Sequence, residues 1–224
     1  MNSNQKESMV RDIFKSISGK YDLFDSMMSL GLDRKWRKIA VSMLGPENDM
    51  RVADVGAGSG KVTEEMLSFN PSLRIDAIDL TEEMFPKNKG KVHFTVASAE
   101  NIPFEADTFH RCISCFLTRN VPTLENYLKE AYRILKEGGV FVNMDIFDPG
   151  KSLIAPAFRV YFYRIMPIIL DTASHTHSYS YLASSVQAFV NPDQFSDLMS
   201  KVGFKHISKK KLAGGSVFIH RGIK

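Results

Sequence analysis

Long apolar runs are missing from this chain of 224 residues, and cysteine is scarce. No stretch reaches the roughly 18 apolar residues that a membrane-spanning helix needs. The opening stretch MNSNQKESMVRDIF also lacks the apolar core of a signal peptide. The two cysteines, Cys112 and Cys115, cannot build a disulfide framework. We therefore expect a cytoplasmic protein whose 44% hydrophobic residues form the core of a single domain.

Metal ligands at useful spacing are also few. Cys112 and Cys115 have C-x-x-C spacing, but they lie in the strand-like run FHRCISCF, where side chains three apart point to opposite faces. His175 and His177 have no cysteine or acid beside them at ligand spacing. We expect no metal, two buried thiols and a solvated histidine loop, with one histidine kept as an alternative catalytic base.

The net charge of +4 is mild. It suits an anionic partner, whether lipid headgroup, nucleic acid or acidic metabolite, and an ordinary lysine-rich surface explains it equally well. Charge therefore selects no function.

Strand and helix patterns alternate through the first two thirds of the chain. Helical spacing marks residues 7–17 and, in two pieces, 21–44. Strands are predicted at 51–55, 73–80, 92–96, 109–116 and 140–146, with helices at 61–69 and from Pro122 to Gly138-Gly139. A helix at 192–202 and two strands joined at Gly214-Gly215 end the chain. This order predicts an α/β fold with a doubly wound, Rossmann-like, seven-stranded and mostly parallel sheet.

Two helical additions to that sheet are expected within one domain, residues 1–224. Residues 1–48 form an N-terminal helical cap. Residues 150–190 break the alternation and read as a helical lid insertion, rich in aromatic residues with two arginines among them: Phe158, Arg159, Tyr161, Phe162, Tyr163 and Arg164.

The stretch DVGAGSGK (54–61) has the look of a nucleotide-binding loop between a strand and a helix. A dinucleotide fold needs GxGxxG, whereas Gly56, Gly58 and Gly60 give GxGxG. A P-loop needs GxxxxGK followed by Ser or Thr, and Val55 and Val62 occupy the first and last of those positions. Neither of these two nucleotide motifs is present.

The surviving pattern is an acid before the loop and a second acid on the next strand. Asp54 can receive an ammonium group, directly or through water, and Asp79 can accept both hydroxyls of a ribose. Gly56 and Gly58 allow the backbone to approach a ligand closely. This combination predicts S-adenosylmethionine (SAM), bound beyond the carboxyl ends of the strands.

Longer segments resemble the ubiquinone/menaquinone biosynthesis C-methyltransferases, a family of class I SAM-dependent methyltransferases. The resemblance rests on KYDLFDSMMSLGLDRKWRK, VADVGAGSGK, ASAENIPFEADTF, SCFLTRNVPTLENYLKEAYRILKEGG, YSYLASSVQAFVNPDQFSDLMSKVGF and LAGGSVFIHRG. It covers nearly the whole chain, and its RNV, YLASS and AGG…HRG parts are the most specific.

The resemblance implies roles for individual residues. Cofactor contacts are implied at Asp54, Gly56, Gly58, Ser59, Gly60, Asp79, Leu80, Ser98, Ala99 and Cys115, with Ser98-Ala99 at the adenine. Arg119 and Asn120 match a pair that faces the substrate. The chain departs from the family pattern where Leu117-Thr118 replace Gly-Leu, Asp33 replaces His, Cys115 replaces Ser and Asp145 replaces Glu. These departures leave the exact quinone open.

The implied acceptor is a prenylated hydroquinone, whose ring carbon attacks the methyl group. We assign Arg119 to the developing phenolate and Asn120 to orientation. Asp145 acts as a carboxylate, directly or as the partner of Arg119, unless it only caps a helix or loop. Tyr21 either closes over the cofactor or packs as an ordinary aromatic residue. We favour demethylmenaquinol because the chain is short and shows no targeting peptide.

A prenyl tail dissolves in the bilayer, so a peripheral contact with the cytoplasmic membrane face is expected. The aromatic lid and the basic residues Arg34, Lys35, Arg37, Lys38 and Lys209–Lys211 are candidates for it. The sequence leaves a homodimer open and gives no reason to expect a nucleic-acid partner. Alternatives are methylation of another small acceptor, nucleic-acid methylation, which lacks its Asn/Asp-Pro-Pro-aromatic motif here, and an inactive SAM-binding scaffold.

Overall fold

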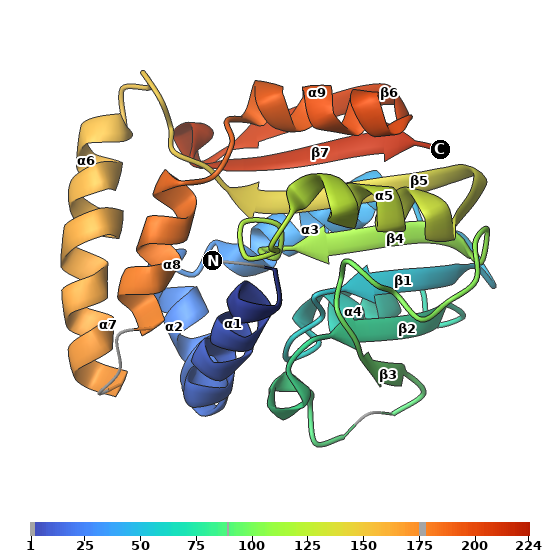
Figure 1. Ribbon diagram of the computed structural model, residues 1–224, viewed down its shortest axis with the longest axis horizontal. Helices are drawn as coiled ribbons and strands as arrows, with labels where there is room; N and C mark the ends of the chain where they lie inside the picture. The colour runs from blue at the N-terminus through green and yellow to red at the C-terminus, as the bar shows by residue number, and fades with distance from the viewer. Residues whose placement is uncertain (1–2, 89, 175–177) are drawn as a thin grey trace.

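The computed structural model describes residues 3–88, 90–174 and 178–224, and its centre is a seven-stranded sheet (Figure 1). The strand order is β3-β2-β1-β4-β5-β7-β6, in which β1 to β5 run parallel and β7 is antiparallel to both neighbours. The strands are β1 Arg51–Val55, β2 Arg74–Asp79, β3 His93–Val96, β4 Phe109–Cys115, β5 Leu135–Ile146, β6 Lys205–Leu212 and β7 Val217–Ile223. The predicted fold class is confirmed.

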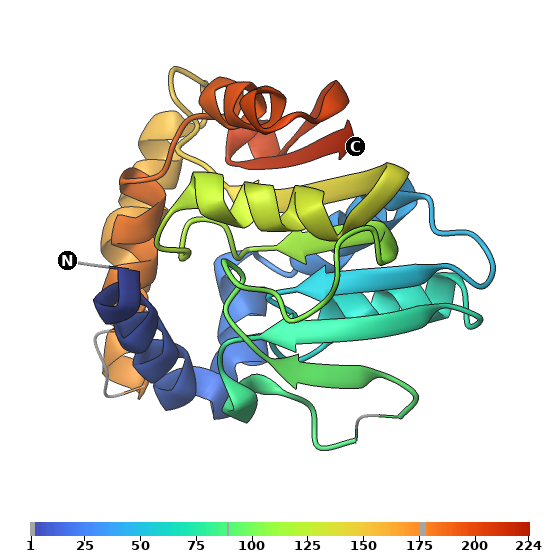
Figure 2. The same cartoon turned by 45° about the vertical axis from the view of Figure 1, so that its right-hand side comes forward.

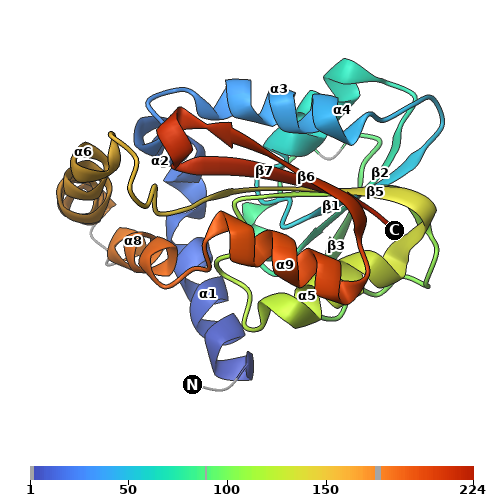
Figure 3. The same ribbon diagram turned by 90° about the horizontal axis from the view of Figure 1, so that it is seen from above.

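Helices cover both faces of this sheet, as the view from above shows (Figure 3). One face carries α3 and α4, and the other carries α5 and α9. The helices are α1 Ser3–Ile17, α2 Tyr21–Met28, α3 Asp33–Leu44, α4 Lys61–Phe69, α5 Leu124–Ile134, α6 Ala155–Val160, α7 Met166–Ser174, α8 Ser178–Gln187 and α9 Pro192–Val202. Short 3-10 turns are η1 Ser18–Lys20, η2 Glu82–Met84 and η4 Ala213–Gly215, and η3 Tyr161–Ile165 is a π-helical turn.

Each face of the sheet buries its own apolar cluster. Cys115 belongs to the cluster under α3 and α4, whereas Cys112 belongs to the cluster under α5 and α9. Both thiols are free and buried, and the apolar surroundings raise the pKa of Cys112. The prediction that residues three apart on this strand face opposite sides is therefore confirmed.

The junction between α5 and β5 differs from the prediction. Sequence periodicity extended the helix through Leu135 to Gly138-Gly139, but the helix ends at Ile134 and Leu135 already pairs with Phe109 of β4. The pairing then jumps to Arg111 opposite Val140, so the intervening residues bulge out of the ladder. Pro122 likewise precedes the helix by two residues instead of opening it.

The N-terminal helices and α6–α8 lie together beyond the carboxyl ends of the parallel strands (Figures 1 and 2). They share an apolar cluster in which Ile17 of α1 packs with residues of α7 and α8, and the Tyr161 hydroxyl donates to the carbonyl oxygen of Met27 at 3.0 Å. Among the described residues, no helix has the length and apolar character needed to cross a bilayer. These helices enclose the edge where a ligand of this fold binds.

Candidate functional site

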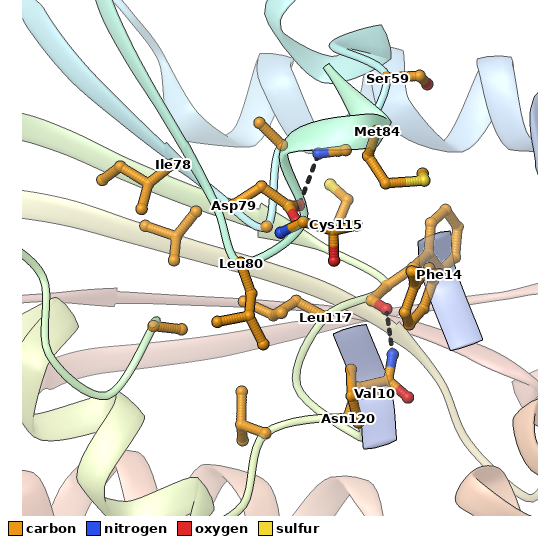
Figure 4. Close-up of a pocket in the computed structure, with 18 of the residues that line it drawn as sticks. Val10, Phe14, Ser59, Ile78, Asp79, Leu80, Met84, Cys115, Leu117 and Asn120 are labelled. Atoms are coloured by element: carbon orange, nitrogen blue, oxygen red, sulfur yellow. Dashed lines mark hydrogen bonds between the residues drawn. The ribbon is translucent and has the colours of Figure 1, made fainter. Parts of the chain in front are cut away.

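A cavity of about 1000 Å³, counted with its open mouth, lies between that sheet edge and helices α1 and α2. Its walls come from the segments that follow β1, β2, β3 and β4. Ten predicted site residues line it: Tyr21, Gly56, Gly58, Ser59, Asp79, Leu80, Ser98, Ala99, Cys115 and Asn120. Five of them, Ser59, Asp79, Leu80, Cys115 and Asn120, are labelled in Figure 4. The other four, Asp54, Gly60, Arg119 and Asp145, lie behind its wall.

The glycine loop turns the chain sharply from β1 into α4. Gly56, Gly58 and Gly60 all have positive φ, at 74°, 51° and 82°. A Cβ on Gly56 would come within 2.9 Å of the Leu117 side chain, so this glycine is required by both conformation and space. Gly60 lies just before the first residue of α4 and shapes the turn from behind the cavity.

Asp79 ends β2 with its carboxylate at the cavity wall. Its Oδ2 accepts from the Gly58 backbone N–H at 2.9 Å (Figure 4), and its Oδ1 accepts from the Thr81 N–H at 2.9 Å. Burial raises the pKa of Asp79, and these backbone donors oppose that rise. The two bonds fix the carboxylate while leaving lone pairs that a diol can use.

Asp54 is fully buried beneath the loop. The Thr63 hydroxyl donates to its Oδ2 at 2.6 Å, but its Oδ1 has no hydrogen-bond partner among the described residues. Burial raises its pKa to about 7, although the Thr63 hydrogen bond opposes the shift. A buried acceptor without a donor is rare in proteins, and an ammonium group of a ligand would satisfy it.

The predicted adenine segment, Ser98-Ala99, follows β3 and forms another part of the cavity wall. The Ser98 hydroxyl donates to the Glu7 carboxylate of α1, and it accepts from the Glu100 N–H at 3.1 Å. Ser98 and Ala99 line the cavity beside Leu80 and Cys115. The Ser98 side chain thereby ties this segment to α1, which closes the cavity.

Helix α1 supplies residues that we did not predict as part of the site. Val10 and Phe14 point into the cavity (Figure 4), and Lys6 donates to the carbonyl oxygen of Val121 at 2.5 Å. The helical apolar stripe of residues 7–17 contained Val10 and Phe14. The stripe indicated that this side of the helix is buried, but it did not show that the cavity lies against it.

Arg119 and Asp145 form a buried ion pair behind the cavity wall. The Arg119 guanidinium donates from Nη1 to Asp145 Oδ1, and Thr118 Oγ1 donates to Oδ2 at 2.7 Å. The backbone N–H of Ile146 also donates to Asp145 Oδ1, at 2.8 Å. The pair thus joins the loop after β4 to the end of β5.

Asn120 is the member of the predicted substrate-facing pair that reaches the cavity. Its Nδ2 donates to the carbonyl oxygen of Phe116 at 3.3 Å, whereas its buried Oδ1 has no partner in the described part of the chain (Figure 4). Phe116 has φ of 63°, so the loop is strained where it turns toward Asn120. An acceptor aimed into a cavity is suited to a hydroxyl of a ligand.

Arg37, like Arg119, does not lie where the sequence predicted, because its side chain is largely buried. We expected it on an exposed basic surface, but its side chain is only 11% exposed and pairs with Asp33, whose Oδ1 also accepts from Ser29 at 2.9 Å. It lines the cavity, as does Lys61, and within the described ranges these two are the basic residues that do so. Arg34, Lys35 and Lys38 of the same helix are exposed as expected.

No group of three or more histidines, cysteines or acids that could hold a metal is found in the described residues. The predicted histidine loop, His175 and His177, lies outside them.

Solved methyltransferases share this fold. One chain is titled a SAM-dependent methyltransferase and possible histamine N-methyltransferase from Thermotoga maritima, with TM-score 0.69 and 19% identity over 96% of this chain and 99% of that one. Another is phosphoethanolamine N-methyltransferase 2 of Haemonchus contortus in complex with SAM, with TM-score 0.63 and 15% identity over 85% of this chain and 52% of that one. At such identities the likeness establishes the fold.

Relatives of higher identity extend over both whole chains. The ubiquinone/menaquinone biosynthesis C-methyltransferases UbiE of Geobacter sp. (strain M21) and Rickettsia bellii (strain RML369-C) are 34% and 32% identical. Each match covers 99% of this chain, and 98% and 95% of the respective relatives. The model of the ubiE/COQ5 methyltransferase family matches residues 2–224. This chain therefore belongs to the ubiE/COQ5 methyltransferase family.

Proposed function

We propose that this protein transfers the methyl group of SAM to a ring carbon of a prenylated hydroquinone in quinone biosynthesis. The observation that carries the proposal is the family match over residues 2–224, together with a cavity at the sheet edge that is lined by Asp79 and the glycine loop, with Asp54 buried beneath that loop. The relatives' name describes C-methylation in both ubiquinone and menaquinone biosynthesis. Within that class, we propose demethylmenaquinol as the acceptor and menaquinol as the product.

The cavity residues fit SAM. Asp79 would accept the ribose hydroxyls, Ser98 and Ala99 would flank the adenine, and the buried Oδ1 of Asp54 would take the ammonium group, directly or through water. Gly56, Gly58, Ser59, Leu80 and Cys115 would contact the rest of the cofactor, while Gly60 shapes the loop from behind. Arg37 would provide a cation for the carboxylate of its methionine part.

When bound, SAM supplies an electrophilic methyl group, so the reaction needs no metal. The acceptor's ring carbon becomes nucleophilic as a neighbouring hydroxyl loses its proton. After the methyl group has moved from the sulfur of SAM to this carbon, the carbon loses its hydrogen as a proton. The protein must therefore stabilise a phenolate, orient the ring and accept a proton.

Asn120 and Tyr21 line the cavity, and we propose that they contact the reacting molecules. Arg119 supplies positive charge behind the wall, but its pair with Asp145 offsets much of it. We therefore propose that the main role of the Arg119–Asp145 pair is to position Asn120. When substrate is bound, Arg119 also stabilises the phenolate. Residues 1–48 act as the cap, with α1 and α2 over the cavity. The lid insertion, residues 150–190, supplies no lining residue in the described ranges, and we propose that it packs against this cap. We further propose a cytoplasmic enzyme with peripheral contact to the membrane.

A turnover assay with two short-tailed quinols tests the proposal. We expect methylation of the demethylnaphthoquinol at a carbon, and little methylation of the benzoquinol. Arg119→Ala should lose turnover and keep SAM binding, whereas Arg34→Ala, an exposed residue of α3, should keep both. Faster turnover of the benzoquinol would identify a benzoquinol as the acceptor instead of demethylmenaquinol. An Arg119→Ala variant with near full activity would refute the proposed role of Arg119 in turnover.

A further inference from the structure

Helices α6 and α7, joined by η3, form one continuous rod at the edge of the molecule, beyond the carboxyl ends of the strands (Figures 1 and 2). Its inner side is packed: Phe162, Met166 and Leu170 are buried, the last two against α8. Its outer side is apolar and exposed. The exposed aliphatic residues of the rod and the turn before it are Leu153, Ile154, Val160, Ile165, Ile168 and Ile169.

This outer face is unusual for a surface in contact with water only. Leu153 is 100% exposed and Ile168 is 69% exposed. The Tyr161 bond to Met27 also places the end of α2 beside η3, and Met27 and Leu30 are exposed there. Grouped exposed aliphatic residues of this kind mark an interaction surface.

The charges on the same segment indicate which partner the face suits. Residues 148–174 contain the basic residues Lys151, Arg159 and Arg164 and the acids Asp148 and Asp171. Asp148 pairs with Arg159 at 2.7 Å, so Lys151 and Arg164 are the cations that this segment offers to an anionic surface. Asp171 is occupied by the backbone of Tyr179 and by the Ser180 hydroxyl. A helix with an aliphatic outer face and basic flanks is typical of segments that lie in the interface of an anionic bilayer.

We propose that the outer face of α6, η3 and α7, with the turns at Leu153 and Leu30, docks on an anionic phospholipid bilayer. This rests on the proposed function, since a prenylated acceptor is dissolved in the bilayer. It also corrects the predicted surface: the aromatic residues of the lid pack inward, with Phe158 stacked on Phe162 at 5.0 Å, and the aliphatic residues face outward. Docking would bring the cavity side of the molecule to the membrane.

Vesicle sedimentation tests the docking. Wild-type protein should pellet with vesicles of phosphatidylcholine and phosphatidylglycerol, and less with phosphatidylcholine alone. The double variant Leu153→Ser/Ile168→Ser should bind at least about tenfold more weakly, because each residue stops burying a large aliphatic side chain. Phe69→Ser is the matched control: Phe69 is 55% exposed at the far end of α4, and its loss should leave vesicle binding unchanged.

Turnover separates this proposal from the proposed function. The double variant should keep wild-type activity on a short-tailed soluble quinol and lose it on a long-tailed quinol in vesicles. Vesicle binding that is unchanged in the double variant would overturn the docking face. A wild-type dimer that the double variant converts to a monomer, without vesicle binding, would assign the face to a second copy instead. Vesicle binding without turnover of any quinol would support docking and refute the function.

Discussion

Replacing Asp145 by Asn should destabilise the fold far more than an exposed substitution of the same kind. Asp145 is completely buried and accepts from Thr118, the Arg119 guanidinium and the Ile146 backbone. The Asn side chain keeps the shape but removes the negative charge, which leaves the Arg119 cation buried without its carboxylate. Breaking a buried pair in this way costs about 3–5 kcal/mol.

For a domain of this size, each kcal/mol shifts the melting temperature by roughly 2–4 °C. The loss therefore predicts a drop of about 6–20 °C, measured by scanning calorimetry. The matched control is Glu125→Gln, because Glu125 pairs with Lys129 and Lys201 at the surface, and we expect this change to leave the melting temperature nearly unchanged. A double variant, Arg119→Met/Asp145→Leu, removes both charges and should be more stable than Asp145→Asn.

The double variant also separates stability from catalysis. If the ion pair serves the reaction, the folded double variant should bind SAM and lack turnover. An Asp145→Asn protein that melts within 2 °C of the wild type, against the roughly 6 °C minimum above, would refute the argument from burial. A double variant that melts below Asp145→Asn would refute the argument from charge.

Three further predictions concern the cofactor site. Asp79→Asn should weaken SAM binding by about tenfold to a hundredfold in calorimetric titration, because charge-assisted bonds to a ribose are lost; unchanged affinity would remove Asp79 from the site. Because folding raises the pKa of Asp54 from 3.8 to about 7, the folded state holds the extra proton, so the free energy of unfolding should fall as pH rises from about 4 to 7. Denaturant titrations across that range measure this loss of unfolding free energy. In Asp54→Asn the loss should be smaller than in the wild type, by up to about 4 kcal/mol in total, and an equal loss in both proteins would contradict the raised pKa. Gly56→Ala should lower stability and SAM affinity through its clash with Leu117, and Leu117→Gly should restore part of both; no restoration would leave backbone strain as the only cause.

Local patterns predicted the part of the site that is made by consecutive residues. The strand, the glycine loop and α4 follow from short-range rules, and Asp79 falls at a strand end in any parallel sheet. The same rules failed at Leu135, which continues the apolar spacing of α5 but is taken into β5 by pairing with Phe109. Helical periodicity cannot register a partner that lies 26 residues earlier.

The sequence offered Asp145 as a partner of Arg119, and the structure contains that ion pair, but sequence reasoning could not show how deeply such residues are buried by the fold. The pairing of β4 with β5 brings Arg119 to Asp145, and this places Arg119 behind the cavity wall instead of in it. Val10 enters the site because α1 crosses the sheet edge. The lid was predicted as helical, yet which residues of it face water depended on its packing against α2 and α8.

The most direct test of quinol methylation is an incubation with lipids from cells that lack a quinone methyltransferase. Purified protein would be mixed with SAM carrying a deuterated methyl group and reduced lipids from cells without their own quinone methyltransferase. We expect a prenylated quinone that carries one labelled methyl group on a ring carbon, and the mass of this product identifies both ring and tail. An unlabelled lipid fraction, with SAM binding confirmed on the same preparation, would contradict quinol methylation.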